Sequence, residues 1–390
     1  MRSYKHLFSR ALAAAPGRLH FAAHSHHLWP DASYEGHVAA WDDAARLADR
    51  KWEKIFGEVI PTTRAHIASE LKLPDPNTIA FAPNTHELAV RLFSARQSRP
   101  PLDVLTSDGE YHAFRRQAAR WEEQGMVRCR IVSCEPFETF TERFLAAMKE
   151  KAPDIAFVSH VMFKSGLRFD GIEEAASFAS PDGTWVVIDG YHGFMALPCD
   201  LSRVADRVFY VGGGYKYAMA GEGAGYLHAP PGFGPRPANT GWFAEFAHME
   251  AKPTGVPYST DGMRFMGATF DATALYRFNF VREMLAREGL DTGAISARVE
   301  TLRDQLEAVI GAGEAGVLRE AELLRPNASG PRARFVSLRD ARATEWKAKL
   351  FEADVITDAR DDVLRIGLAV YHDAEDVGAL CAKVAKALRG

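Results

Sequence analysis

Short β-rich runs alternate with longer helical patterns through the middle of this 390-residue chain, and this alternation constrains the fold more than any other feature. The runs expected to form strands cover residues 78–81, 103–106, 127–132, 155–159, 185–188, 208–211 and 225–228. Between them, apolar residues at helical spacing predict helices over 85–95, 113–123, 139–149 and 172–179. Such alternation predicts an α/β fold, in which helices sandwich a mostly parallel sheet and binding residues lie at the carboxyl ends of its strands.

The segments that flank this alternation predict a second, smaller domain. Residues 30–71 give a helical pattern, and residues 230–257 interrupt the rhythm with Gly, Pro and Trp before helical spacing resumes over 272–287. The C-terminal part is expected to contain a helix over 295–310, strands near 335–338 and 363–369, and a last helix from residue 374. We therefore expect a large α/β domain over 30–285, and a small α+β domain that 1–29 and 286–390 form together.

Composition excludes several classes of protein. The net charge of −4, with both signs interleaved along the chain, gives no reason to expect a nucleic-acid partner. No apolar run approaches the roughly 18 residues of a membrane-spanning helix. Four scattered cysteines in a chain of this length are typical of a reducing compartment. We expect a cytoplasmic protein that does not contact a membrane.

Two candidate catalytic residues follow neighbouring apolar strands. The run 185–188 ends in Asp189, and the run 208–211 leads through three glycines to Lys216. Because the carboxyl ends of parallel strands share one edge of a sheet, both side chains can face one pocket. A desolvated lysine can form an imine with an aldehyde cofactor. A buried aspartate can keep a pyridine nitrogen protonated, which makes the ring an electron sink for a carbanion at Cα.

The spacing alone also allows other interpretations. Lys216 can be a solvated lysine after a glycine turn, and Asp189 a capping residue. A nucleotide-binding domain is disfavoured, because the Gly212–Gly214 run lacks both the Gly-x-Gly-x-x-Gly spacing and a fitting acidic residue downstream. Acidic and cysteine neighbours are sparse around the N-terminal histidines, so no metal site is expected there. These are His20, His24, His26 and His27.

Several motifs in the same order resemble the aminotransferase class V family of fold type I pyridoxal-phosphate enzymes, and kynureninases most of all. An Asp-x-x-His segment ends one strand at Asp189 and His192, and the pair Tyr215-Lys216 follows the next strand. The other segments that carry the resemblance are Gly221-x-Gly-x-Gly225, His20–Pro30, Val161–Asp170, Gly241-Trp-Phe243 and Leu364–His372. The resemblance implies a fold type I transferase-like fold, with pyridoxal 5'-phosphate held by Lys216 as a Schiff base.

The resemblance also implies which residues bind the cofactor phosphate. Asn84 and Thr85 would begin a helix whose free backbone N–H groups face the phosphate. Tyr215 would donate to the phosphate and shuttle a proton during catalysis. Trp242 and the stretch that ends at Thr269 resemble elements that reach the phosphate from a second subunit. We therefore expect a homodimer with active sites at its interface.

Further residues are assigned to the cofactor ring and to the substrate. Asp189 and His192 would contact the ring, and the Glu110–Ala113 segment would supply an aromatic plate over it. We favour His112 as this plate, with Tyr111 as the alternative. Two residues are expected to bind the amino-acid substrate, namely Arg365, through a bidentate pair with the α-carboxylate, and His26 near the substrate mouth.

The reaction is less constrained than the cofactor. The overall pattern favours hydrolytic cleavage of a Cβ–Cγ bond, as in kynureninases. However, His112–Arg115 does not reproduce the Phe-Pro-Ser/Thr-Asp of kynureninases, and Arg264–Thr269 lacks their Ser-Asn. An aminotransferase that acts on an unidentified amino acid is therefore the alternative. A cysteine desulfurase is disfavoured, because no cysteine lies between Cys199 and Cys381 to serve as the nucleophile.

Overall fold

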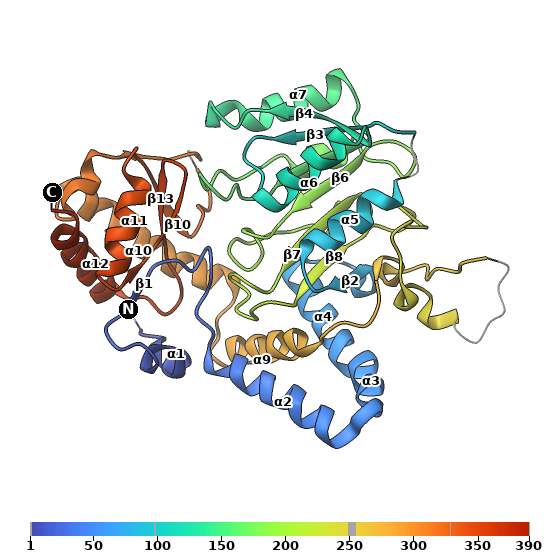
Figure 1. Cartoon of the computed structure of the whole chain (residues 1–390), viewed down its shortest axis with the longest axis horizontal. Helices are drawn as coiled ribbons and strands as arrows, with labels where there is room; N and C mark the ends of the chain where they lie inside the picture. The colour runs from blue at the N-terminus through green and yellow to red at the C-terminus, as the bar shows by residue number, and fades with distance from the viewer. Residues whose placement is uncertain (1, 97–98, 249–254, 328, 390) are drawn as a thin grey trace.

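The computed structural model describes residues 2–96, 99–248, 255–327 and 329–389. A seven-stranded sheet in the order β2-β8-β7-β6-β5-β3-β4 forms its centre (Figure 1). The strands are β2 (Ile79–Ala82), β3 (Leu102–Ser107), β4 (Val127–Val132), β5 (Ile155–Ser159), β6 (Trp185–Asp189), β7 (Val208–Gly213) and β8 (Gly225–His228). All of their pairings are parallel except those of β8, which runs antiparallel to both β2 and β7.

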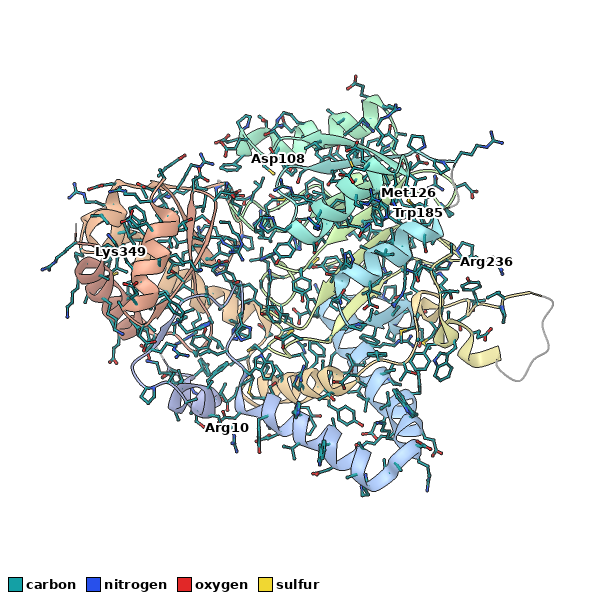
Figure 2. All side chains as sticks on the ribbon, in the orientation of Figure 1. Arg10, Asp108, Met126, Trp185, Arg236 and Lys349 are labelled. Carbon is teal, nitrogen blue, oxygen red and sulfur yellow. The ribbon has the colours of Figure 1, made fainter. Side chains whose placement is uncertain are left out.

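Burial of the sheet on both faces explains why its strands, apart from the exposed edge strand β4, have largely apolar sequences. Every residue of β5, and the first four of β6, are buried. Side chains fill the space between the sheet and its helices, where Trp185 lies (Figure 2). Each large apolar side chain that is removed from water contributes about 1.5–3 kcal/mol to folding. These strands therefore form a rigid platform for residues at their carboxyl ends.

Helices pack against this platform through aromatic contacts. The helices that follow the strands are α5 (Thr85–Ala95), α6 (His112–Glu123), α7 (Phe140–Glu150) and α8 (Ile172–Ala176). The ring of Phe114 on α6 stacks on Phe157 of β5, with centroids 3.7 Å apart. Phe93 of α5 in turn stacks on Trp121 of α6 at 4.6 Å. These contacts fix α5 and α6, whose N-termini lie at the binding edge of the sheet.

The long helical pattern over 30–71 is divided into several segments. They are α2 (Asp31–Leu47), α3 (Lys51–Lys54), the π-helical turn Ile55–Val59 and α4 (Ile60–Leu71). The break follows α2 at Ala48, which has a φ of 49°. Helix α9 (Thr273–Arg287) packs beside α2 (Figure 1), and a Cβ on Gly36 would lie 2.8 Å from Cα of Arg277. A glycine is therefore required where these two helices cross.

A second, antiparallel sheet belongs to the C-terminal part, in the order β12-β13-β10-β9. Its strands are β9 (Glu322–Leu323), β10 (Phe335–Arg339), β12 (Asp358–Arg360) and β13 (Val363–Gly367), and its helices are α10 (Thr292–Ala312), α11 (Ala343–Glu352) and α12 (Ala374–Ala387). The N-terminal strand β1 (Leu19–His20) pairs in parallel with β11 (Val355–Ile356). The N-terminal segment therefore lies against the C-terminal part (Figure 1). The domain boundaries expected at residues 29 and 285 stay a prediction.

The fold class expected from the sequence is confirmed, with differences at the level of single elements. Strand β8 reverses direction, and α8 ends three residues before the expected 179. The remaining short segments are α1 (Ser9–Ala13) and the 3-10 turns Lys5–Phe8, Ala48–Arg50, Pro76–Thr78, Phe137–Thr139, Trp242–His248, Gly262–Phe265 and Gly316–Glu320. Among the described helices, none combines the length and the apolar character that crossing a bilayer requires.

Candidate active site

Lys216 lies in the closed loop that connects β7 to β8. The backbone N–H of Gly214 donates to the carbonyl of Ala224 at 2.9 Å, and that of Ala220 donates to the carbonyl of Gly214 at 2.8 Å. These bonds tighten the loop where the two antiparallel strands end. The side chain of Lys216 is thereby held inside the protein, with 7% of the residue exposed. The reversal of β8 therefore creates the turn that presents the lysine.

Arg277 on α9 and Trp29 pack against this loop and fix its conformation. The Arg277 guanidinium donates to the carbonyls of Ala220 at 2.6 Å and Glu222 at 2.5 Å, and its Cζ lies 4.9 Å from the Trp29 ring. Gly221 has a φ of 69°, and a Cβ there would overlap the Trp29 ring. Arg277 was not identified from the sequence, because α9 also contains Arg282, Glu283 and Arg287 and nothing in the pattern distinguishes it from them.

The amine of Lys216 is surrounded by rings. Its Nζ is in hydrogen-bond contact with Nε2 of His192, and lies 5.2 Å from the ring of Tyr191 and 5.4 Å from that of Tyr111. Burial lowers the pKa of Lys216 well below its usual value, and the charge of Arg365 lowers it further. Burial, together with Lys216, also lowers the pKa of His192. Burial therefore favours the uncharged form of this amine, which is the form that acts as a nucleophile.

Asp189 ends β6 on the neighbouring strand, as expected. One of its carboxylate oxygens accepts a hydrogen bond from the backbone N–H of Tyr191 at 2.9 Å. Burial raises the pKa of Asp189, while the Tyr191 hydrogen bond and the charge of Lys216 act in the opposite direction. Asp189 ends β6 and Lys216 follows the adjacent strand β7, and the two lie close enough for the charge of Lys216 to act on the carboxyl group.

A second buried carboxyl group, Glu110, was not identified from the sequence. It accepts hydrogen bonds from the hydroxyls of Ser107 at 2.6 Å and Ser159 at 2.5 Å, and from the backbone N–H of Ser159 at 3.2 Å. Burial raises the pKa of Glu110 to about 7, and the nearby Asp189 contributes to this rise. Because Glu110 joins the ends of β3 and β5, it fixes the turn that leads into Tyr111.

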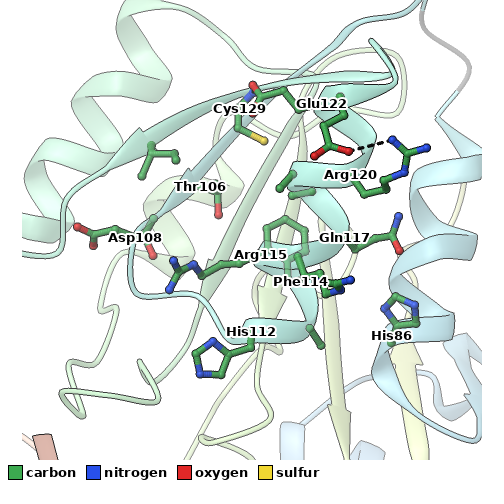
Figure 3. A pocket seen from close by; sticks show the side chains of 17 residues that line it. His86, Thr106, Asp108, His112, Phe114, Arg115, Gln117, Arg120, Glu122 and Cys129 are labelled. Carbon is green, nitrogen blue, oxygen red and sulfur yellow. Dashed lines mark hydrogen bonds and ion pairs between the residues drawn. The ribbon is translucent and has the colours of Figure 1, made fainter. Parts of the chain in front are cut away.

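The structure places the two candidate plates next to each other. Tyr111 precedes α6 in an extended conformation, and its ring lies 5.4 Å from Nζ of Lys216. His112 is already helical, and its ring lies 5.6 Å from that of Tyr111 and 5.0 Å from that of Phe163. His112 also lines a hollow of about 1030 Å³ beside α6, together with His86 and Arg115 (Figure 3). Which of the two rings stacks on the cofactor stays a prediction.

The expected phosphate-binding residues begin α5. Asn84 is the N-cap, and its side-chain oxygen accepts from the backbone N–H of Glu87 at 3.0 Å. Thr85 is the first helical residue, so the backbone N–H groups of this turn lie at the positive end of the helix. Gly225 begins β8 directly against this cap, and a Cβ there would lie 2.7 Å from the carbonyl carbon of Asn84. The helix N-terminus and the lysine loop therefore share one edge.

Tyr215 and His26 contact each other at the outer side of the lysine loop. The hydroxyl of Tyr215 lies 2.9 Å from Nδ1 of His26, and their rings meet edge to face at 5.2 Å. Tyr215 is half-buried and His26 is exposed. The neighbouring His20 and His27 turn elsewhere, towards Tyr371 and the carbonyl of Leu28. Within the described ranges, no three side chains are grouped as metal ligands.

The two segments expected to serve a second subunit form one surface. The backbone N–H of Phe243 donates to the carbonyl of Gly267 at 3.1 Å, and a Cβ on Gly241 would overlap the backbone of Gly267. Trp242 is 42% exposed and Thr269 is also exposed. Both predicted residues therefore lie on the outside of this chain.

Arg365 on β13 is buried near the lysine, with 2% exposed. Its guanidinium donates to the carbonyl of Phe163 and forms an ion pair with Asp358. The Cζ atom lies 5.6 Å from the ring of Phe163 and 5.8 Å from that of Phe335. Burial lowers the pKa of Arg365, whereas Asp358 raises it. A buried arginine flanked by aromatic rings is suited to bind a carboxylate.

A buried amine, a carboxylate on the adjacent strand, an aromatic ring and a helix N-terminus are the groups that pyridoxal phosphate requires. With the mostly parallel sheet, they define a fold type I pyridoxal-phosphate enzyme. The family model described as aminotransferase class-V matches residues 43–315, and the chain belongs to this family. Pyridoxal phosphate is its cofactor.

Two curated relatives match across most of the chain. An isopenicillin N epimerase of Streptomyces clavuligerus is 27% identical over 320 residues, which cover 78% of this chain and 79% of the relative. A probable cysteine desulfurase of Vibrio cholerae is 27% identical over 353 residues, covering 83% and 81%. Neither is a kynureninase, so the closer likeness to kynureninases that the motifs indicated is not supported.

Solved structures share the fold at lower identity. A cystine C-S lyase, in complex with cysteine persulfide, superposes with a TM-score of 0.81 at 18% identity, covering 96% of this chain and 99% of the other. A cysteine desulfurase from Thermococcus onnurineus NA1 also has a TM-score of 0.81, at 16% identity with 99% and 98% covered. These likenesses concern the fold.

Proposed function

We propose that this enzyme carries pyridoxal phosphate on Lys216 and cleaves a bond at the β-carbon of an amino acid with an aromatic side chain. The reaction that we favour is hydrolysis of the Cβ–Cγ bond of an aromatic amino ketone. One observation carries the choice. The Phe163 ring lies 5.6 Å from Cζ of Arg365, and 5.4 Å and 6.4 Å from the rings of Tyr111 and His192, which both lie beside the amine of Lys216. A substrate held between the lysine and the arginine must place its side chain against these rings.

This aromatic wall favours a substrate side chain that is itself aromatic. Phe163 meets Tyr111 edge to face at 89°, and Phe335 lies 6.5 Å from His192 on the other side. Each aromatic contact of this geometry contributes about 0.5–1.5 kcal/mol beyond the burial of area. A small polar side chain would not make these contacts with the aromatic rings.

The chain's own residues have distinct roles in this proposal. When bound, pyridoxal phosphate supplies an electron sink for negative charge at Cα. Lys216 removes the α-proton and returns it, since burial favours the uncharged form of its amine. Asp189 holds the proton of the cofactor's ring nitrogen. The Tyr215 hydroxyl, bonded to His26, carries protons between the site and solvent.

The remaining residues position the cofactor and the substrate. Tyr111 stacks on the cofactor ring, and His192 donates a hydrogen bond to the cofactor. The backbone N–H groups at Asn84 and Thr85 bind the phosphate, and the surface with Trp242 and Thr269 completes the site of a second copy in a homodimer. Arg365 binds the α-carboxylate.

Desulfuration through a cysteine persulfide is disfavoured by the thiols of the chain. The sequence contains four cysteines, and all four are described. Burial raises the pKa of Cys129 and Cys381 to about 11, and that of Cys199 to about 12. Cys134 borders a hollow of about 480 Å³ shared with Phe163, and burial raises its pKa further still. Since the thiolate is the nucleophile, none of these cysteines is activated.

A panel of amino acids tests the proposal. Purified protein with added pyridoxal phosphate is incubated with kynurenine, phenylalanine, cysteine and alanine, and the products are separated by chromatography. We expect alanine and an aromatic acid from kynurenine. Lys216→Ala should abolish both the product and the visible absorbance of lysine-bound cofactor. Lys72→Ala is the matched control, because this lysine is exposed and pairs with Asp200.

Other outcomes would overturn the proposal in identifiable ways. Accumulation of pyridoxamine phosphate without bond cleavage would establish transamination, the alternative that the sequence left open. Inversion at Cα without a new product would establish epimerisation, the activity in the name of the Streptomyces relative. Release of sulfide from cysteine would establish desulfuration.

A further inference from the structure

His24 occupies a position next to Arg365 that the backbone fixes. The N–H of Phe21 donates to the carbonyl of Ile356 at 2.8 Å, and the N–H of Gly367 donates to the carbonyl of Phe21 at 2.6 Å. The ring of His24 then lies against the backbone of Gly367, where any Cβ would overlap Nδ1. A glycine at the end of β13 therefore makes room for this imidazole two residues beyond Arg365.

The ring of His24 is fully buried and neither nitrogen is hydrogen-bonded. Its exposure is 0%, and no partner for Nδ1 or Nε2 is found in the described part of the chain. Three other histidines in this region have bonded nitrogens: His20 with Tyr371 at 2.7 Å, His27 with Leu28 at 2.7 Å, and His372 with the carbonyl of His20 at 2.8 Å. A buried polar group without a partner destabilises a fold, so His24 is not explained by packing alone.

A second unpartnered donor lies close by, on Arg365 itself. Its Nε is buried and, over the described ranges, has no acceptor. The Nη2 atom of the same guanidinium pairs with Oδ2 of Asp358. Nε2 of His24 lies 3.8 Å from this same oxygen, which is too long for a hydrogen bond. Arg365 and His24 therefore border one carboxylate, and each keeps an unused donor.

His24 lies near the side chains that surround the amine of Lys216. Its ring lies 4.8 Å from that of Phe335, which lies 6.5 Å from His192, the neighbour of Lys216. Burial lowers the pKa of His24, and the charges of Arg365, His192 and Lys216 lower it further. At neutral pH the ring is uncharged and has one N–H to donate.

We propose that His24 and Nε of Arg365 together bind the α-carboxylate of the substrate, one donor for each oxygen. The assignment rests on the proposed function, since it requires an amino acid at Lys216. A carboxylate accepts hydrogen bonds on both oxygens, so two convergent donors fix its plane as well as its position. His24 thereby acts as a positioning residue that fixes the direction of the bonds at Cα.

The test compares two probes that differ only in the carboxylate, L-phenylalanine and 2-phenylethylamine. Each is titrated into protein loaded with pyridoxal phosphate, and the dissociation constant is read from the change in visible absorbance. For His24→Leu we expect binding of L-phenylalanine about 10- to 100-fold weaker, and unchanged binding of the amine. His24→Gln, which keeps a donor, should recover part of the loss.

Stability provides a second measurement that is independent of turnover. Because both nitrogens of His24 are unpartnered among the described residues, His24→Leu should leave the unfolding temperature unchanged or raise it. If L-phenylalanine binds the variant and the wild type equally, His24 only fills space and the assignment is wrong. Equal weakening of both probes would also overturn it, by placing His24 on the cofactor. Wild-type protein that responds to neither probe would instead overturn the proposed function.

Discussion

Replacing Lys216 by methionine should stabilise the cofactor-free protein, and the gain should depend on pH. Lys216 is buried, and burial is the main cause that lowers its pKa well below 10.5. Arg365 acts in the same direction, while Asp189 and Asp358 oppose it. Folding therefore removes a proton from this amine at pH values between its lowered pKa and 10.5. Lys216→Met removes the free-energy cost of taking this proton off the amine, because methionine has a similar length and carries no charge.

The direction and size of the effect follow from proton linkage. Between the lowered pKa of folded Lys216 and pH 10.5, the unfolded chain binds one proton more than the folded chain. The free energy of unfolding of the wild type therefore rises with pH in this window, by about 1.4 kcal/mol for each pH unit. The advantage of Lys216→Met is largest at the low end of the window and disappears towards pH 10.5.

Urea unfolding of the cofactor-free proteins at pH 7, 8 and 9 measures this slope. Lys72→Met is the control, since this side chain is 63% exposed and pairs only with Asp200 in the described part of the chain. We expect the difference between Lys216→Met and the wild type to shrink with pH, and that between Lys72→Met and the wild type to stay constant. A constant difference for Lys216→Met would show that its amine is charged in the folded protein, contrary to the reasoning above.

Three further predictions concern the neighbouring residues. Glu110, with its pKa raised to about 7, keeps a proton that the unfolded chain releases above pH 4.5. Stability should therefore fall as pH rises from 4.5 to 7, and Glu110→Gln should flatten this profile in urea titrations. Gly36→Val should lower the free energy of unfolding by about 1–3 kcal/mol, because its side chain separates α2 from α9; an unchanged midpoint would contradict this. Tyr111→Leu should weaken pyridoxal phosphate binding about 2- to 10-fold in an equilibrium titration, and His112→Ala should not. Weaker cofactor binding by His112→Ala, with no effect of Tyr111→Leu, would identify His112 as the plate.

The sequence predicted the large sheet well, because all of its strands except the edge strand β4 are largely buried. The runs 127–132, 155–159 and 225–228 coincide with β4, β5 and β8. The antiparallel direction of β8 was not predictable, since an apolar run does not indicate whether a strand is parallel or antiparallel to its neighbours. The break after α2 was also missed, because it depends on the backbone of Ala48, an ordinary helix-forming residue. Two-residue strands such as β9 and β11 are too short to show a period.

Within the site, the residues proposed from the sequence lie at or just after the end of a strand. Asp189 ends β6, and Lys216 follows the adjacent β7 by three residues, in the loop that leads to β8. His24, Glu110 and Arg277 were missed because their roles arise from contacts with distant segments. His24 was noted as one of four neighbouring histidines, and nothing in that run distinguishes it from the others. Burial, which the fold alone determines, makes the distinction.

The pairing of β1 with β11 has a consequence for the order in which the enzyme is assembled. Arg18 and Asp354, which flank this pairing, are separated by 336 positions, and His20 and Tyr371 by 351. At the usual rate of protein synthesis, on the order of half a minute passes between the emergence of these segments from the ribosome. Helix α9 ends at Arg287, so the loop with Lys216 and the helix that fixes it leave the ribosome before β11, on which the segment with His24 docks. The side that receives the substrate is thus the last to form.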